Sequence, residues 1–464
     1  MLALCAASRV VLAQVPAGPD WKALEPEMMR HYQAVLRLDT TNPPGNERRA
    51  VDYLKQVLDQ AGVPNQVFAL DENRPNIVAR LKGSGKKRPL LIMGHTDTVT
   101  VDAAKWKHSP FSATREGGYV YGRGTVDDKD NLAAALMTMV LLKRQAVPLD
   151  RDVIFLAESG EEGNSNFGIQ FMVAQHYAEI EAEYCFAEGG GVTRIGGAPK
   201  FATVQATEKI PRGIELVATG ISGHGSVPLP SNAVVHLAAA VARIGEWRPD
   251  VRLNETTGTY FRRLASIAPP ETAKQYRDVL SADPKVRAAA DDWLFEHEPQ
   301  HSSMLRTSVS PNIFDGGYRF NVIPSEAKAT LDVRMLPDED AAKFLEQVKQ
   351  IVNDPNVEAR FPSQNTRPAG VAARVDSEPF KAIEAVNGRI YNVPTLPTMS
   401  TFATDMAQLR AKGVPCYGIG PAVDLEDGPK GFGMHSDQER LLESELYRFM
   451  RFNYEVVVEL GGTR

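Results

Sequence analysis

The sequence predicts an α/β fold in which a mostly parallel sheet is flanked by helices and interrupted by an inserted α+β domain. Short apolar runs alternate with amphipathic helices over the first ~200 residues, the pattern of strands buried on both faces of a parallel sheet. From residue 212 the pattern becomes the alternation typical of antiparallel strands. The chain has 464 residues, more than one domain usually contains. We therefore predict a larger domain formed by 17–207 and 371–464, and an inserted domain formed by 208–370.

The elements of the larger domain follow from apolar periodicity and from the positions of glycine and proline. Two N-terminal segments have helical spacing and are separated by the loop Asn42-Pro43-Pro44-Gly45-Asn46. Apolar runs of four to eight residues then indicate strands. The predicted helices are 21–38, 49–61 and 132–145; the predicted strands are 66–70, 76–81, 152–157, 183–187 and one that begins at residue 90.

Composition excludes several classes of function. A net charge of −6 offers no basic surface, so nucleic-acid binding is not expected. Three cysteines, Cys5, Cys185 and Cys416, make neither a disulfide framework nor a thiolate metal site. No segment approaches the ~18 uninterrupted apolar residues that a membrane span requires.

The first residues form a separate segment. Residues 1–13 are apolar, rich in small residues, and end Val11-Leu12-Ala13, a plausible signal-peptidase site. Arg9 interrupts the segment and a charged N-terminal region is missing. We interpret 1–13 as a signal segment and expect a periplasmic or secreted protein; the alternative is a cytoplasmic protein with an N-terminal tail.

Three apolar strands of the larger domain are followed by residues that can bind metal. His95 and Asp97 end the first of them and point to the same side, because side chains two apart on a strand share a face. Such a pair alone is more often structural, but a metal-binding histidine usually gives its second ring N–H to a carboxylate. The next strand ends in Glu161 and Glu162, and a third in Glu188. Carboxylates at neighbouring strand ends repel one another unless a cation lies between them.

Two further carboxylates, Asp127 and Asp128, immediately precede a strongly helical segment. One interpretation is helix capping, for which aspartate is favoured. The other is that at least one of them joins the strand-end cluster.

These motifs, in this order and spacing, resemble the co-catalytic zinc peptidases that include aminoacylase, glutamate carboxypeptidase and succinyl-diaminopimelate desuccinylase. The resemblance covers nearly the whole chain after residue 20. It implies two zinc ions, with Asp127 as the bridging carboxylate. His95 and Glu188 would hold one ion, and Glu162 and His435 the other. The motifs are Gly94-His95-Thr96-Asp97, Gly122-Arg123-Gly124 with Asp127-Asp128-Lys129, Glu161-Glu162-Gly163 and Glu188-Gly189.

The resemblance also assigns roles that are not metal ligation. Glu161 is expected to be the general base, and Asp97 the partner that orients His95. Asp130 stands where the family usually has glycine, which could alter the loop beside the bridging ligand. No proposed ligand is lost, so we expect metal binding to persist.

In this family the inserted domain is a lid or dimerisation domain. His224, on the glycine-rich stretch 220–228, resembles the family's substrate-polarising histidine, which is often donated across a dimer. Asn321 and Arg334 resemble substrate contacts; Arg334 would bind a carboxylate, for which guanidinium is suited. A helical segment, 250–305, is longer than simple members require and most resembles the carboxypeptidase S and N-acyl-amino-acid hydrolase branch.

The sequence thus predicts a metallohydrolase that cleaves the amide bond next to a free α-carboxylate, in a small peptide or an N-acyl amino acid. A homodimer through the inserted domain is possible. One alternative is a non-catalytic binding protein on the same scaffold, which would need neither Glu161 nor His224. Another is a different dinuclear-zinc reaction such as phosphate-ester hydrolysis, which the motifs of the inserted domain disfavour.

Overall fold

The computed structural model describes residues 18–362 and 367–463. The predicted signal segment, 1–13, lies outside the described residues. No helix within the described part of the chain is long and apolar enough to cross a membrane.

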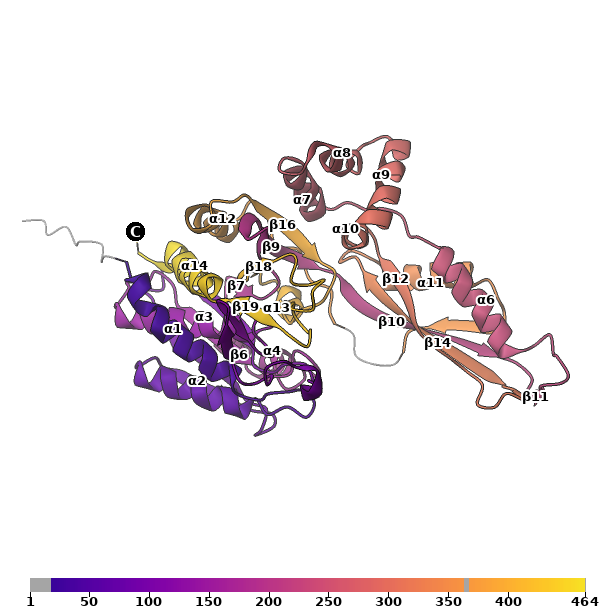
Figure 1. Ribbon diagram of the computed structural model, residues 1–464, viewed down its shortest axis with the longest axis horizontal. Helices are drawn as coiled ribbons and strands as arrows, with labels where there is room; N and C mark the ends of the chain where they lie inside the picture. Colours follow the sequence, from indigo (N-terminus) through magenta and orange to yellow (C-terminus); the bar gives the residue numbers. More distant parts are fainter. Residues whose placement is uncertain (1–17, 363–366, 464) are drawn as a thin grey trace, which may run out of the picture.

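A ten-stranded sheet forms the centre of the larger domain (Figure 1). The four central strands are parallel, and antiparallel strands lie toward both edges. The strands follow the order β1 (Asn65–Phe68), β2 (Asn76–Leu81), β6 (Val153–Glu158), β3 (Leu90–His95), β7 (Tyr184–Ala187), β17 (Cys416–Gly418), β9 (Ala198–Glu208), β8 (Gly191–Ile195) and β18 (Ala422–Asp424), with β16 (Thr395–Ser400) paired to β9.

Helices cover both faces of this sheet. Strand β3 shows why, because Leu90 and Ile92 belong to one hydrophobic core while Leu91 and Met93 belong to the other. The continuous apolar run is therefore a strand buried on both faces, as predicted. Helices α1 (Trp21–Leu36), α2 (Arg48–Gln60), α3 (Lys129–Arg144), α12 (Glu378–Ile390) and α14 (Glu443–Gly461) contribute to the first core, and α4 (Ile169–Gln175), α5 (Tyr177–Ile180) and α13 (Met406–Ala411) to the second.

A small sheet holds two loops of the larger domain beside each other. It is formed by β4 (Thr114–Glu116), β5 (Tyr119–Tyr121) and β19 (Arg440–Leu442), and a short helix, η1 (Ala103–Lys105), precedes it. Because β19 pairs with β5, the chain before β19 lies next to the chain after β5.

The inserted domain has an antiparallel sheet that extends away from the larger domain (Figure 1). At its far tip, β11 (Gly223–His224) pairs with β13 (Val322–Ile323). Helices α6 (Ala233–Glu246) and α11 (Ala341–Val352) pack on the sheet. The sheet order is β12 (Ser308–Gly316), β14 (Glu326–Met335), β10 (Ile210–Thr219) and β15 (Val357–Arg360).

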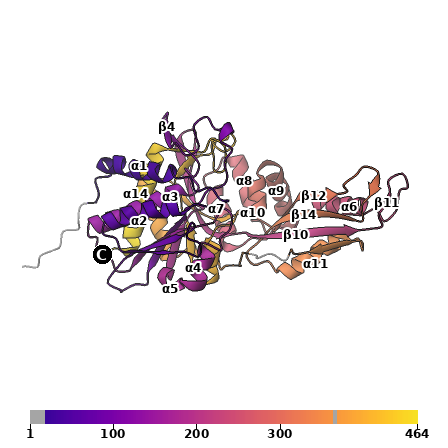
Figure 2. The same ribbon diagram turned by 90° about the horizontal axis from the view of Figure 1, so that it is seen from below.

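Four helices within the predicted insertion form a separate group that packs on the larger domain through α7. These insert helices are α7 (Glu255–Ala265), α8 (Pro270–Asp278), α9 (Pro284–His297) and α10 (Pro299–Met304); the last three start with proline, which is favoured in the first turn. Leu264 shares a hydrophobic core with Leu396 and Met399 of β16. Figures 1 and 2 show the insert helices beside the junction of the two parts.

Candidate metal centre

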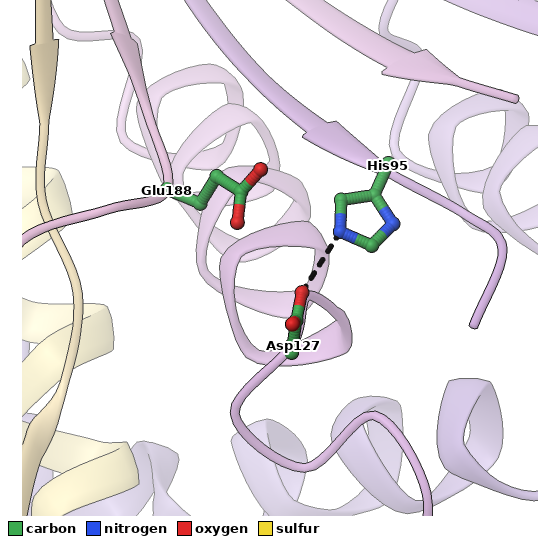
Figure 3. A group of neighbouring side chains, drawn as sticks. All are labelled: His95, Asp127 and Glu188. Atoms are coloured by element: carbon green, nitrogen blue, oxygen red, sulfur yellow. Dashed lines mark hydrogen bonds and ion pairs between the residues drawn. The ribbon is translucent and has the colours of Figure 1, made fainter. Parts of the chain in front are cut away.

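Three central strands and the start of α3 deliver the predicted ligands to one edge of the sheet. His95 ends β3, Glu162 lies in the turn after β6, and Glu188 directly follows β7. Asp127 lies two residues before α3. Carboxyl ends of parallel strands meet at one edge, where α/β sheets place their sites. Figure 3 shows His95, Asp127 and Glu188 facing one another.

The ligands form two groups that share Asp127. His95, Asp127 and Glu188 place one ligand atom each within 4.8 Å of the others, and so do Asp127, Glu162 and His435. Nε2 of His95 lies 3.0 Å from Oδ1 of Asp127, and Nε2 of His435 lies 2.9 Å from Oδ2. The two oxygens of one carboxylate therefore face two different histidines. This is the arrangement expected of a residue that bridges two ions.

The charges of the centre fit a pair of cations. Burial, and then the neighbouring Asp127, raises the pKa of Glu188 well above its ordinary value. Hydrogen bonds with Asp127 and Glu162 raise the pKa of His435 to about 10. Imidazole and carboxylate groups are the nitrogen and oxygen ligands that suit Zn²⁺.

Asp97 holds two parts of the site. The Nδ1 atom of His95 lies 3.1 Å from the backbone oxygen of Asp97 and 3.4 Å from its Oδ1. The carboxylate also accepts hydrogen bonds from the backbone N–H groups of Glu161 and Glu162 and from the side chain of Asn42. Asp97 thus contacts a ring nitrogen of His95 and also fixes the turn after β6, which no sequence pattern indicated.

A buried ion pair joins the Asp127 loop to the His435 loop. Nη1 of Arg123 donates to Oε2 of Glu439 at 2.7 Å, and both side chains are almost fully buried. Glu439 also accepts from the backbone N–H of Val126 at 2.9 Å. His435 has a φ of 62°, an uncommon conformation for a residue other than glycine. The ion pair and the β5–β19 pairing together hold the loop that carries this ligand.

Asp128 and Asp130 are not ligands in either group. The Asp128 side chain makes no capping hydrogen bond with α3; it accepts from the backbone N–H of His95 at 3.0 Å. Asp130 is fully buried, and its carboxyl oxygens have no side-chain hydrogen-bond partner among the described residues. Burial, and then Asp128, raises the pKa of Asp130 well above its ordinary value. Asp130 therefore departs from the family pattern without displacing a ligand.

Glu161 lies beside the ligands without joining either group. Burial, and then the charge of Asp405, raises the pKa of Glu161 to about 8, although Arg367 opposes this effect. Nη2 of Arg367 lies 2.9 Å from Oε1 of Glu161, and Nη1 lies 3.5 Å from Oδ1 of Asp405. Sequence reasoning missed Arg367, because it is 206 residues from Glu161 and carries no motif.

The three predicted residues of the inserted domain do not lie together: His224 and Asn321 are neighbours at its tip, and Arg334 is near the far end of β14. His224 is exposed at the tip, and its Nδ1 atom lies 2.7 Å from Oγ of Ser226. Asn321 is beside it, since its backbone oxygen accepts from Gly225. Arg334 lies near the other end of β14 and pairs with Asp332 at 2.8 Å. A single chain in this arrangement does not bring His224 and Asn321 to the metal centre.

Comparison with known proteins gives the class that this fold and site define. Residues 91–459 match the model of Peptidase family M20/M25/M40, and the chain belongs to this family of metal-dependent hydrolases. It is 30% identical over 387 residues to a probable carboxypeptidase S-like protein of Dictyostelium discoideum, covering 80% of this chain and 71% of that protein. It is 24% identical over 395 residues to aminoacylase-1 of Mus musculus, covering 84% and 86%. It is also 27% identical over 334 residues to a probable succinyl-diaminopimelate desuccinylase of Staphylococcus aureus, covering 71% and 74%.

Solved structures share the fold. An M20 family metallo-carboxypeptidase from Sulfolobus solfataricus matches with a TM-score of 0.70 at 21% identity, covering 94% of this chain and 99% of that one. A Bacillus subtilis protein described as a dinuclear metal binding peptidase of family M20 matches with a TM-score of 0.59 at 15% identity, covering 95% and 99%. This chain is thus a metallohydrolase that is similar to carboxypeptidases and aminoacylases.

Metal binding to the metal-free protein should release protons. With its pKa raised to about 10, His435 is protonated at neutral pH and must lose that proton to become a ligand. Apparent metal affinity should therefore rise up to ~tenfold per pH unit below pH 10 for this one proton. Titration calorimetry at pH 7.5, in two buffers of different ionisation enthalpy, measures the release. Binding without proton release would contradict the assignment of His435.

Replacing Asp130 by asparagine should stabilise the protein at high pH. Native Asp130 keeps its proton above pH ~3.9, where the unfolded chain loses it, so this residue lowers stability progressively as pH rises toward the raised pKa. The melting temperature of metal-loaded Asp130→Asn should equal that of wild type near pH 4 and exceed it at pH 8. The matched control is Asp52→Asn, on the exposed face of α2. A variant that melts lower than wild type at pH 8 would refute this account.

Proposed function

We propose that this protein is a dinuclear zinc hydrolase that cleaves the amide bond next to a free α-carboxylate, as a carboxypeptidase or an N-acyl-amino-acid hydrolase. The observation that carries the proposal is Asp127, whose two oxygens face the histidines of two adjacent ligand groups while a carboxylate outside both groups, Glu161, lies next to them. The alternative of a pure binding protein gives Glu161 no role.

The proposed chemistry divides between the ions and the chain. Two zinc ions would polarise the scissile carbonyl and lower the pKa of the attacking water. Glu161 would accept the proton of that water and deliver it to the leaving amine. Asp97 would keep the turn that carries Glu161 and Glu162 in register with His95. The products are a carboxylate and a free amine.

Recognition of the substrate carboxylate is assigned to the inserted domain. Arg334 lies next to the C-terminal end of β14, where it pairs with Pro211 of β10. His224 and Asn321 lie beyond the other end of that strand, so ~27 Å of strand separates them from Arg334. All three can contact one substrate only if a second copy supplies the tip.

Exposed apolar side chains on the inserted domain support such a homodimer. Tyr318 is 81% exposed and Ile221 is 68% exposed, both near the tip, and Ile313 on the edge strand β12 is 60% exposed. Edge strands and apolar patches are surfaces on which protein chains associate. We propose that the inserted domains of two copies pair through this surface.

The variant Glu161→Gln should lose turnover and keep its metal. An amide cannot accept the proton of the attacking water, so we expect a fall in kcat of ~10²–10⁴-fold. Elemental analysis should still find two zinc ions per chain, and exposed Glu72→Gln should behave as wild type. Unchanged turnover would refute the role of Glu161, and loss of zinc would instead make it a ligand.

Two inactive variants should restore activity when mixed, if the site spans two copies. His224→Ala and Glu161→Gln damage different halves of a shared site. Half of the randomly formed dimers would be mixed, each with one complete site, so about a quarter of wild-type activity should return. The measurement is turnover of the co-expressed mixture, and the mixed dimer purified from it should have about half of wild-type activity. No recovery in a verified mixed dimer would show that His224 does not act across the interface.

A further inference from the structure

We propose that a cavity between the metal centre and the insert helices binds the acyl group of the substrate, and that it takes an uncharged, extended apolar acyl group in preference to one with a second carboxylate. The inference rests on the proposed function and names its substrate class.

The cavity has a volume of about 670 Å³ and is continuous with the metal centre. This lies in the ~300–1,000 Å³ range of pockets that bind small molecules. At one end it is lined by Asp127, Glu162 and His435, and at the other by Tyr260 of α7 and Met304 of α10. The described part of the antiparallel sheet in the inserted domain contributes no lining residue. The cavity is therefore formed by the larger domain and the insert helices.

The position of the cavity indicates that it binds the acyl group of the substrate. The proposed contact for the α-carboxylate, Arg334, is on the inserted domain and does not line the cavity. The scissile carbonyl must lie at the metal centre. The acyl group, on the other side of that carbonyl from the amino acid, is then directed toward the insert helices.

The walls are apolar and accessible. Five of the apolar side chains that the larger domain contributes to the lining remain partly exposed, from 39% for Ile195 at the end of β8 to 58% for Leu425. Met434, next to the ligand His435, is 56% exposed. Partly exposed apolar side chains around one cavity indicate a ligand that covers them. The apolar lining includes Ile195, Leu264, Met304, Phe402, Val423 and Leu425.

The charges of the lining disfavour an acyl group with a second carboxylate. No lysine or arginine lines the cavity among the described residues. Beyond the metal centre, the acidic or basic side chains of its lining are Glu298 and His301, which lie 2.5 Å apart. Tyr276 donates to Glu298, and the hydroxyl of Tyr260 lies 2.8 Å from Nε2 of His301. Both ring nitrogens of His301 are thus engaged within the cluster.

A succinyl group would therefore bring a second carboxylate into a cavity whose described lining offers it no lysine or arginine and already contains the carboxylate of Glu298. Burial alone would raise the pKa of Glu298, but its hydrogen bonds with His301 and Tyr276 outweigh burial and the pKa is lowered. Glu298 is consequently ionised at neutral pH. An unpaired carboxylate that loses water beside it is disfavoured by both desolvation and repulsion.

The test compares acyl groups of different length and charge on one amino acid. N-acetyl-, N-pentanoyl-, N-octanoyl- and N-succinyl-leucine are assayed with the zinc-loaded enzyme. From acetyl to octanoyl, kcat/KM should rise up to ~threefold per buried methylene. N-pentanoyl-leucine should exceed N-succinyl-leucine, which has a similar length, at least ~tenfold. Equal or faster hydrolysis of the succinyl compound would overturn the inference.

Two variants place the effect in this cavity. Gln300→Arg adds a guanidinium to the lining, and should raise the ratio of succinyl to pentanoyl hydrolysis ~tenfold. Gln350→Arg adds the same charge on α11, outside the cavity, and should leave the ratio unchanged. Leu264→Trp fills the lining and should lower the ratio of octanoyl to acetyl hydrolysis. Unchanged ratios in Gln300→Arg and Leu264→Trp would overturn the assignment.

The outcomes separate this inference from the proposed function. If N-acetyl-leucine is hydrolysed while the length and charge of the acyl group have no effect, only the acyl site is wrong. If the zinc-loaded enzyme hydrolyses none of the acyl-leucines and no carboxyl-terminal peptide bond, the proposed function fails as well.

Discussion

Mutual repulsion among carboxylates at one edge of the central sheet is the constraint on which the site depends. Asp127 lies within ligand reach of Glu188 on one side and of Glu162 on the other, and burial together with Asp127 raises the pKa of Glu188. Histidines face both oxygens of Asp127, and that geometry leaves places for two cations. The strands bring these carboxylates together, and bound cations would make their closeness favourable.

The protein surrounds this centre with neighbours that hold each ligand in place. Asp97 accepts hydrogen bonds from the turn that carries Glu161 and Glu162, and it also contacts His95. The Arg123–Glu439 ion pair connects the loop of the bridging ligand to that of the last one. A buried ion pair leaves an uncompensated charge if either partner is removed, so the two loops are constrained together. Geometry at the centre is set by these contacts rather than by the ligands alone.

The insertion divides into two parts with different positions. Its antiparallel sheet carries Arg334 and the tip that holds His224, whereas the insert helices pack on β16 and close the cavity beside the metal centre. Arg367 belongs to the segment by which the chain returns from the insertion, and it pairs with Glu161. The positive charge next to Glu161 is thus supplied from outside the sheet that carries the ligands.

The sequence by itself predicted the central strands of the larger domain and the candidate ligands that meet at one edge of its sheet. A strand buried on both faces is legible as a continuous apolar run, and ligands that follow such runs must meet at one sheet edge, as His95, Glu162 and Glu188 do. Spacing along the chain is local information, and it was sufficient for these residues. Whether Asp128 caps a helix or joins the strand-end cluster was open; in the structure it accepts a hydrogen bond from the backbone N–H of His95 and belongs to neither ligand group.

Features that join residues far apart in the chain were decided by the tertiary structure alone. The contact of Arg367 with Glu161 joins positions 206 residues apart, and no periodicity encodes it. The cavity is lined by the larger domain together with helices from within the insertion. Its volume, and the absence of lysine and arginine from its described lining, therefore arise only when the chain folds. Pairing and packing across the fold carry this information, because they depend on which surfaces meet rather than on which residues are neighbours in sequence.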